Sequence, residues 1–451
     1  MLCLAQFMLI IDITVVNVAL PSIARDLSLG DTSLTWVVAA YSLCFGGLLL
    51  LGGRLADGLG RRRTFLLGLG IFTAASLASG LATSGGMLIT ARAAQGVGAA
   101  LLSPAAMSII TTTFHGSERN RALGVWGAIG GSGAALGVLL GGALTAGPGW
   151  AWVFYINVPI GAAVFALVPT VVPSTPGDGL RGLDLRGAVT VTATAALGIY
   201  GLIQAGHTGW GSISALVPLC AAAAAAVVFV VVEHAAEVPL VRLSLLARRQ
   251  IADGVTAMLG GSTLLLTGFF LISLDLQRLL GYSALRTGLA FLPVTVATVA
   301  GAHLAAHAIG HLGFRRVAAT GFTLAGIGAA LMARIPRDAH LFTDVVPGFV
   351  LLAMGAGAVF VSASISAMHQ VDHREAGLVS GIVNTGHELG AALGVALASA
   401  LAVSSLAAGS VHGLRTAFTV AYVLALTAAV LSLRLLPAGR PDPSAAPVFG
   451  H

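Results

Sequence analysis

Apolar residues recur along this chain of 451 residues in blocks of about twenty, separated by short polar or glycine-rich breaks. A block of that length crosses ~30 Å of hydrocarbon as a helix, so each block is a predicted membrane span. The predicted spans are 2–22, 33–53, 64–84, 87–113, 120–146, 151–171, 184–206, 211–233, 251–275, 285–309, 314–334, 343–369, 376–405 and 415–436. The pattern therefore predicts an all-α polytopic membrane protein with about fourteen transmembrane helices.

Composition supports this prediction, because 9% of the residues are charged and 57% are hydrophobic, whereas about a quarter of a soluble protein is charged. The net charge is +6, and all the basic residues are arginine. This use of arginine, together with the richness in Ala and Gly, is typical of a high-GC bacterial genome. No dense basic patch with interleaved aromatics is present, so we expect no nucleic-acid partner. If the first helix runs outward, sixteen arginines fall on inner loops and six on outer loops. We therefore expect a bacterial cytoplasmic (inner) membrane protein with both termini in the cytoplasm.

The organisation along the chain indicates two related halves. The longest hydrophilic connection, 173–186, follows the sixth span, and Gly133-Ala-Ala-Leu-Gly137 recurs as Gly390-Ala-Ala-Leu-Gly394. Transporters are commonly built from such repeats, with the substrate site between them near the bilayer midplane. We expect an N-terminal six-helix bundle at 1–172, a linker with two inserted transmembrane helices at 173–250, a C-terminal six-helix bundle at 251–437 and a cytoplasmic tail at 438–451. Because Met1 opens almost directly into the first span, we expect that span to be retained, not cleaved as a signal peptide.

The loop after the second span has the pattern Gly-Arg-Leu-Ala-Asp-Gly-Leu-Gly-Arg-Arg-Arg over residues 53–63. Glycines permit a tight turn, and an Asp at the head of a helix can pair with arginine or accept backbone N–H groups. This loop resembles the signature of the major facilitator superfamily, which implies the major facilitator fold and a cytoplasmic gate. The gate residues implied by the resemblance are Gly53, Asp57, Gly60, Arg61 and Arg62. Gly58 stands where the family usually has a basic residue, so the partner of Asp57 is left open.

Three isolated charges stand inside predicted spans: Asp12, Arg92 and Glu388. A charge at mid-membrane costs ~2.5–3.5 kcal/mol even on lenient scales, so such residues usually face a cavity or a partner. The sequences around Asp12 and Glu388 resemble the fourteen-span drug:proton antiporter family of the superfamily, a group of multidrug and antibiotic efflux transporters. The sequence around Arg92 resembles the fourth-helix motif of the superfamily, in which the arginine is linked to proton coupling. These resemblances imply proton and substrate coupling at all three. A purely structural role in a polar network remains the alternative for each.

Polar residues close to these charges are candidates to line a substrate cavity, namely Asn17, Gln95 and Asn384. Gln95 lies three residues after Arg92 and shares its helix face. His387 precedes Glu388 directly, and since adjacent helical residues point about 100° apart, it need not face the same cavity.

The fifth span contains a run of glycines that permits close packing of helices. Gly133, Gly137, Gly141 and Gly142 are the predicted antiporter packing residues, and dense small residues as ordinary membrane packing remain the alternative. Val138 replaces the proline of the family's antiporter motif. Similarly, Ala151 replaces an arginine at the entry to the sixth span.

Other chemistry finds little support in the sequence. His303, His307 and His311 are spaced at i, i+4 and i+8, which is compatible with a metal or a proton relay. His307 and His311, however, stand where the degenerate loop motif of the second half would have arginines, so we expect no metal and no cofactor. The three cysteines lie in apolar blocks, and no nucleophile and base arrangement is evident, so we expect no enzyme activity.

The resulting hypothesis is a monomeric, proton-coupled exporter of drugs or other small amphipathic or cationic compounds, whose partners are the substrate, protons and the lipid bilayer. Export of a lipid or of an endogenous secondary metabolite is one alternative. A non-transporting membrane sensor or scaffold is another, although it would not need charges at mid-membrane.

Overall fold

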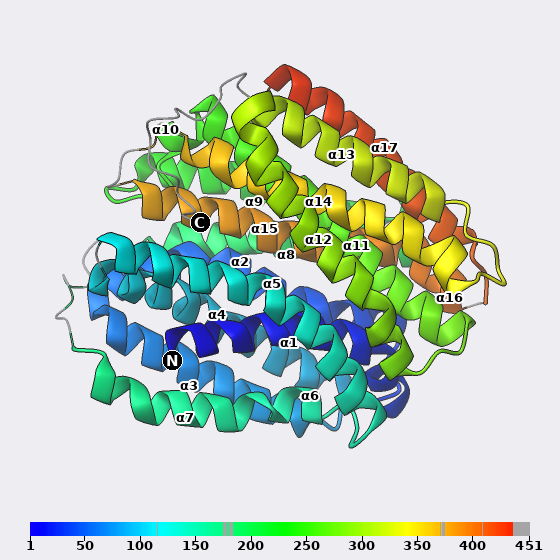
Figure 1. The fold of residues 1–451 in the computed structure, drawn as a ribbon, viewed down its shortest axis with the longest axis horizontal. Coiled ribbons are helices and arrows are strands. Elements are labelled where there is room, and N and C mark those ends of the chain that lie inside the picture. Colours follow the sequence, from blue (N-terminus) through cyan, green and yellow to red (C-terminus); the bar gives the residue numbers. More distant parts are fainter. Residues whose placement is uncertain are drawn as a thin grey trace.

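A computed structural model describes residues 1–114, 116–174, 177, 179, 184–369, 371, 375–407 and 409–435, and these residues form helices and no strand. The predicted tail at 438–451 lies outside the described residues, as does most of the segment 175–183 in the predicted linker. Figure 1 shows the helices of the first half stacked below those of the second half.

Each of the fourteen predicted spans corresponds to a long helix or to two or three consecutive helical pieces. The first half contains α1 (Leu2–Asp26), α2 (Asp31–Leu59), α3 (Arg61–Gly80), α4 (Gly85–Thr113), α5 (Gly116–Ala146), α6 (Trp152–Tyr155) and α7 (Asn157–Val171). The linker contains α8 (Leu185–Thr208), α9 (Ile213–Ala235) and the short α10 (Leu243–Leu246). The second half contains α11 (Arg249–Leu274), η1 (Asp275–Leu279), α12 (Ala284–Leu312), α13 (Phe314–Met332), η2 (Leu341–Val345), α14 (Val346–Met368), α15 (Ala376–Ala398), η3 (Ser399–Val403), α16 (Ser404–Ala407) and α17 (His412–Leu435). The predicted all-α polytopic fold is confirmed.

Eleven helical segments of the described chain are long and apolar enough to cross a membrane. The remaining predicted spans are α5, of which Gly133–Ala146 is a shorter apolar stretch, and α13 and α15, whose glycines and polar residues lower their mean hydropathy. Because the number of spans is even, α1 begins and α17 ends at the same end of the molecule, which we call the inner end. The opposite end is called the outer end.

The two halves repeat the same local packing. In the first half α5 lies against α1, and a Cβ on Gly141 would come within 2.9 Å of the Val15 Cα. In the second half α15 lies against α11 in the same way, because a Cβ on Gly390 would overlap the Leu259 carbonyl oxygen. The hydroxyl of Thr263 also donates to the Gly390 carbonyl across this contact, at 3.0 Å. Glycines of α5 and of α15 therefore permit a close approach to the first helix of each bundle.

The connection from the second to the third helix is also repeated. Gly60 joins α2 to α3 with φ +93°, and Gly313 joins α12 to α13 with φ +78°. A side chain is strained at such angles, so glycine permits an abrupt reversal between long helices.

The two bundles meet along α2 with α15 and along α5 with α12. A Cβ on Gly288 of α12 would overlap the carbonyl oxygen of Val138 on α5, so these two backbones touch near the outer end. Polar contacts also join the bundles in the outer half: the Ser273 hydroxyl donates to the Asn17 carbonyl at 2.5 Å, and Gln277 Nε2 donates to the Val18 carbonyl at 2.9 Å.

The inserted hairpin of α8 and α9 covers the seam between α2 and α15, behind α15 in Figure 1. Ile199 and Ile203 of α8 pack in one cluster with Ala39 of α2 and Ala392 of α15. Helix α9 of this hairpin is largely exposed and carries apolar side chains such as Val227, which suits a surface in contact with lipid. The fold thus consists of two six-helix bundles with two inserted helices between them in the chain, the arrangement that the sequence predicts.

Candidate functional site

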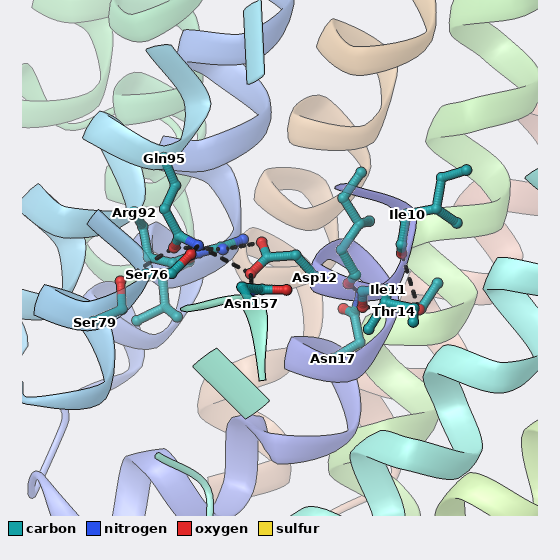
Figure 2. Close-up of polar contacts among 12 residues, drawn as sticks. Ile10, Ile11, Asp12, Thr14, Asn17, Ser76, Ser79, Arg92, Gln95 and Asn157 are labelled. Carbon is teal, nitrogen blue, oxygen red and sulfur yellow. Dashed lines mark hydrogen bonds and ion pairs between the residues drawn. The ribbon is translucent and has the colours of Figure 1, made fainter. Parts of the chain in front are cut away.

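Asp12 is the centre of a buried polar network in the first bundle (Figure 2). Its carboxylate forms an ion pair with the Arg92 guanidinium of α4. Two amide groups add hydrogen bonds to the other carboxylate oxygen: Gln95 Nε2 at 3.0 Å and Asn157 Nδ2 at 3.1 Å. An isolated charge within a span is therefore fully compensated in this conformation, as a buried charge requires.

Arg92 is held by contacts on several sides. Its Nε donates to the Val37 carbonyl of α2 at 3.1 Å, and its Nη1 donates to Gln95 Oε1 at 3.0 Å. The guanidinium carbon lies 4.4 Å from the centre of the Tyr41 ring, and a ring face attracts a cation at this distance. The spacing of three residues places Arg92 and Gln95 on one helix face, as predicted.

The network continues from Gln95 to α3. The Gln95 Nε2 also donates to the Ser76 hydroxyl at 2.7 Å, and the Ser79 hydroxyl donates to Gln95 Oε1 at 3.1 Å. These residues are all buried, so the hydrogen-bond network connects α1, α3, α4 and α7 through side chains alone. Such satisfied networks fix helices relative to one another, because any change that leaves a member unpaired is costly.

Asn157 and the two serines were not among the predicted site residues. Asn157 stands at the start of α7, inside the apolar entry to the sixth span, and this polar residue in an apolar block was the signal that could have identified it. Serine is too common in membrane helices for Ser76 or Ser79 to be selected from the sequence.

Glu388 lies in the other bundle, on α15, and is buried with 7% exposure. Its Oε1 lies 3.3 Å from His387 Nδ1, so the two neighbouring side chains do meet, although their helical positions point apart. Asn384 is exposed and lies four residues earlier, on the same helix face as Glu388. The carboxylates of Asp12 and Glu388 have different partners among the described residues: Arg92, Gln95 and Asn157 around Asp12, and His387 beside Glu388.

Asn17 lies one turn beyond Asp12 on α1, in the region where α1 meets the second bundle. Its Nδ2 donates to the Ile13 carbonyl at 2.9 Å, and its Oδ1 is buried without a hydrogen-bond partner among the described residues. Buried side-chain acceptors normally have a partner, and the hydrogen bonds of this conformation do not supply one for Asn17 Oδ1.

The predicted gate residues surround the turn between α2 and α3 at the inner end. Arg62 Nη1 donates to the Val172 carbonyl at 3.0 Å and so caps the end of α7, and Arg54 Nη2 donates to the Pro239 carbonyl at 3.2 Å. Gly60 occupies the turn itself, and a Cβ on Gly53 would approach only Pro104. Arg62 and Arg54 therefore bind backbone carbonyls of neighbouring segments. Asp57 also takes part in an interaction.

The predicted packing glycines of α5 face two different helices. A Cβ on Gly133 would meet Ile10 at 3.0 Å, and one on Gly137 would overlap the Thr14 hydroxyl, so both lie against α1. Gly142 instead faces α12, where a Cβ would lie 2.8 Å from the Ala284 carbonyl oxygen. Glycines of α5 therefore form part of the contact between the two bundles as well as the interior of the first.

The histidines at the inner end of α12 are exposed. The rings of His303 and His307 lie 4.5 Å apart, and His307 Nδ1 lies 2.9 Å from the His303 carbonyl oxygen. No group of three or more His, Cys, Asp or Glu side chains with metal-binding geometry occurs in the part of the chain that the structure describes.

The sequence matches the family model described as Major Facilitator Superfamily over residues 2–301 and 254–450. The chain is 39% identical to the cephamycin export protein CmcT of Amycolatopsis lactamdurans, covering 85% of this chain and 80% of that protein. It is 37% identical to the puromycin resistance protein pur8 of Streptomyces alboniger, covering 96% and 89%. It is also 37% identical to the lincomycin resistance protein of Streptomyces lincolnensis, covering 97% and 91%.

Solved structures share the fold at low sequence identity. A bacterial homologue of the human lysosomal transporter Spinster, in an inward-facing and unoccupied conformation, matches with a TM-score of 0.68 at 18% identity over 98% of both chains. A peptide transporter in complex with sulfate matches with a TM-score of 0.68 at 15% identity, over 97% of this chain and 94% of that one.

Proposed function

Because the chain belongs to the major facilitator superfamily and its relatives include antibiotic-export and multidrug-resistance transporters, we propose that it exports small amphipathic or cationic compounds across the bacterial cytoplasmic membrane in exchange for protons. The observation that supports this most is the buried Asp12–Arg92 pair. Charges are expensive inside a membrane protein and are usually retained there for transport.

In the proposed cycle, Asp12 changes its partner. A proton on Asp12 removes the negative charge that holds Arg92, so protonation weakens the ion pair and frees the α1–α4 contact. A deprotonated Asp12 or Glu388 can instead attract a cationic substrate. Proton and substrate compete, because one carboxylate in a low-dielectric site does not hold both. Asp12 is sealed from solvent in the conformation described here, so proton exchange at this residue requires a second conformation.

The second conformation would be reached by rocking of the two bundles about a central site. The contacts that must separate on the outer side are the Ser273–Asn17 and Gln277–Val18 hydrogen bonds and the 2.6 Å contact between the Thr35 and Ser399 hydroxyls. At the inner end, the gate residues around Asp57 and Arg62 would exchange contacts in the opposite sense. In this proposal, both chain termini lie in the cytoplasm.

Export of an endogenous secondary metabolite is the second candidate function. It is favoured by the relatives named as a cephamycin export protein and a probable actinorhodin transporter, since both names describe natural products. The same transport mechanism would serve either substrate class. Lipid export and a non-transporting sensor are the remaining alternatives.

The test is a susceptibility panel of drugs, dyes and natural-product antibiotics in a pump-deficient host. It compares wild type, Asp12→Asn and the control Asp338→Asn, whose acid is exposed on an outer loop. We expect resistance with wild type and control and none with Asp12→Asn at equal membrane abundance. Full resistance in Asp12→Asn would remove Asp12 from the mechanism. Purified wild type in proteoliposomes should also acidify or alkalinise the lumen when substrate is added, and no substrate-driven proton movement would contradict antiport.

A further inference from the structure

A row of basic side chains runs along the inner end of α12 and into the start of α13, and it has no role in the mechanism above. The histidines stand one turn apart on α12, and two arginines follow the turn between the helices. All are exposed except Arg315, which is half-buried. We call these residues the basic stripe: His303, His307, His311, Arg315 and Arg316.

The histidines lie on the side of α12 that other helices leave uncovered. Gly288 faces α5 and Gly301 faces α14, because a Cβ on either would overlap a backbone carbonyl oxygen of that neighbour. A third side of the helix carries the exposed apolar side chains Leu289 and Val296. His303 follows these two at steps of seven residues, or two helical turns, and therefore lies on the same side. An exposed apolar side of a membrane span faces lipid, so this side changes from apolar residues to histidines toward the inner end.

The length of α12 places the histidines near the lipid headgroups. Its 29 residues extend about 43 Å, whereas the hydrocarbon of a bilayer is ~30 Å thick. Exposed Arg286 lies over the Tyr282 ring, 5.0 Å from its centre, and such residues are typical of a membrane interface. About twenty residues later the helix leaves the hydrocarbon, close to His307. His311 then lies among the headgroups, and His303 lies one turn inside the hydrocarbon.

The charge of the basic stripe is not neutralised by acids of its own helices. The chain has no Asp or Glu between residues 276 and 337, a range that includes all of α12 and α13. The side chains of Arg315 and Arg316 form no hydrogen bond or ion pair in the part of the chain that the structure describes. Arginines of the corresponding loop in the first half, by contrast, bind backbone carbonyls. Glu375, an acid before α15, is already paired with Arg248 at 2.7 Å.

His307 is oriented so that one ring nitrogen is free to bind a ligand. Its Nδ1 lies 2.9 Å from the His303 carbonyl oxygen, and since a carbonyl only accepts, this nitrogen carries a hydrogen. The other nitrogen, Nε2, can take up a proton and then donate, and a nearby phosphate favours that cationic form. The rings of His303 and His307 lie 4.5 Å apart, so both can approach one phosphate.

We infer that the basic stripe binds the headgroup of an anionic phospholipid at the inner end of the second bundle. The histidines donate hydrogen bonds to its phosphate, and the arginines supply permanent charge and paired N–H donors. The acyl chains lie along the exposed apolar side of α12, past Val296. Because the ligands come from both α12 and α13, a bound lipid stabilises the turn between them. This inference does not rest on the transport cycle proposed above.

The test is a lipid titration of the purified full-length protein in uncharged detergent, with the melting temperature as readout. Phosphatidylglycerol is compared with phosphatidylcholine of the same acyl chains, which has no net charge. A ligand of the folded state raises the melting temperature, so we expect the larger rise with phosphatidylglycerol. His307→Gln with Arg316→Gln should weaken the apparent affinity at least about ten-fold, because each basic group near a membrane surface contributes roughly five-fold. The matched control is His234→Gln with Arg242→Gln, the same changes on exposed residues after the inserted hairpin's apolar stretch, and it should match wild type.

A second variant separates loss of charge from damage to the turn. His307→Arg with Arg316→Lys keeps the positive charge and should keep the preference for phosphatidylglycerol. For every variant the compared quantity is the rise caused by the lipid, so a lower starting melting temperature does not affect the result. Equal rises with the two lipids in wild type, or equal affinity for phosphatidylglycerol in the glutamine variant and its control, would overturn the inference. An equal rise with inorganic phosphate alone would overturn it too, because the stripe would then bind free phosphate and not a lipid.

Discussion

Arg92 of α4 and Asp12 of α1 form an ion pair in which neither side chain is more than 1% exposed. The groups that hydrogen-bond to this pair all come from helices of the first bundle: Val37 of α2, Gln95 of α4 and Asn157 of α7.

Removing one member of the pair should damage folding as well as transport. Arg92→Met leaves the Asp12 carboxylate buried without its counter-charge, and breaking a buried pair in this way costs about 3–5 kcal/mol. The double variant Asp12→Leu with Arg92→Met should recover most of that stability, because replacing both charges by apolar groups is often close to neutral. Thermal unfolding in detergent measures the stability, and efflux should stay absent in both variants. Efflux by the stable double variant would show that the pair has a structural role only.

The close approach of α2 and α4 should not tolerate a methyl group at Gly96. A Cβ there would overlap the Tyr41 carbonyl oxygen and lie 2.8 Å from the Cys44 Cβ. Gly96→Ala must push the two helices apart, so we expect a lower melting temperature and loss of efflux, since the same movement displaces Tyr41 from Arg92. Gly86→Ala on the same helix is the control, because no atom lies within 4 Å of a Cβ at that position. Equal stability of the two variants would contradict the packing seen between α2 and α4.

The outer contact between α5 and α12 should depend on Gly288. A Cβ on Gly288 would overlap the Val138 carbonyl oxygen, so Gly288→Ala should separate the two helices near the outer end. Val138 is buried with 1% exposure, so V138C should react slowly with a membrane-impermeant thiol reagent in the native background and at least about ten-fold faster with Gly288→Ala. Gly310→Ala, which has open space on the same helix, should leave the reaction slow. Slow labelling of V138C in both backgrounds would contradict this prediction, because it would show that Gly288→Ala does not expose residue 138 to the reagent.

The inner end of the inserted hairpin should depend on Asp184. Its Oδ1 accepts from the Gly187 N–H at 2.7 Å as the N-cap of α8, and its Oδ2 accepts from the Leu240 N–H at 3.4 Å in the segment after α9. Asp184→Ala loses the cap and leaves a second donor unpaired, so we expect about 1–3 kcal/mol lower stability. Ser212→Ala removes a cap from α9, where the Ser212 hydroxyl accepts from the Ala215 N–H at 3.3 Å, and should have the smaller effect in the same melting experiment. If both variants melt alike, the contact with Leu240 contributes no stability.

Most of the architecture could be predicted from the sequence because membrane insertion depends on local hydropathy. The predicted span 87–113 and the helix Gly85–Thr113 differ by two residues at one end, whereas the predicted span 33–53 falls six residues short of the end of the helix Asp31–Leu59. The repeat of Gly133 and Gly137 at Gly390 and Gly394 likewise indicated two related halves, and in the structure these glycines pack α5 against α1 and α15 against α11.

Which polar groups meet was decided by the tertiary structure alone. The sequence identified Asp12, Arg92 and Glu388 as isolated charges, but the residues that surround them come from helices far apart in the chain. Asn157 reaches Asp12 from α7, the Tyr41 ring reaches Arg92 from α2, and His387 meets Glu388. A hydropathy pattern establishes that a residue lies in a span, because the cost of burial depends on that residue and its neighbours in sequence. The direction in which its side chain points, and the partner that it finds there, depend on the crossing of helices, and that is settled only when the bundles pack together.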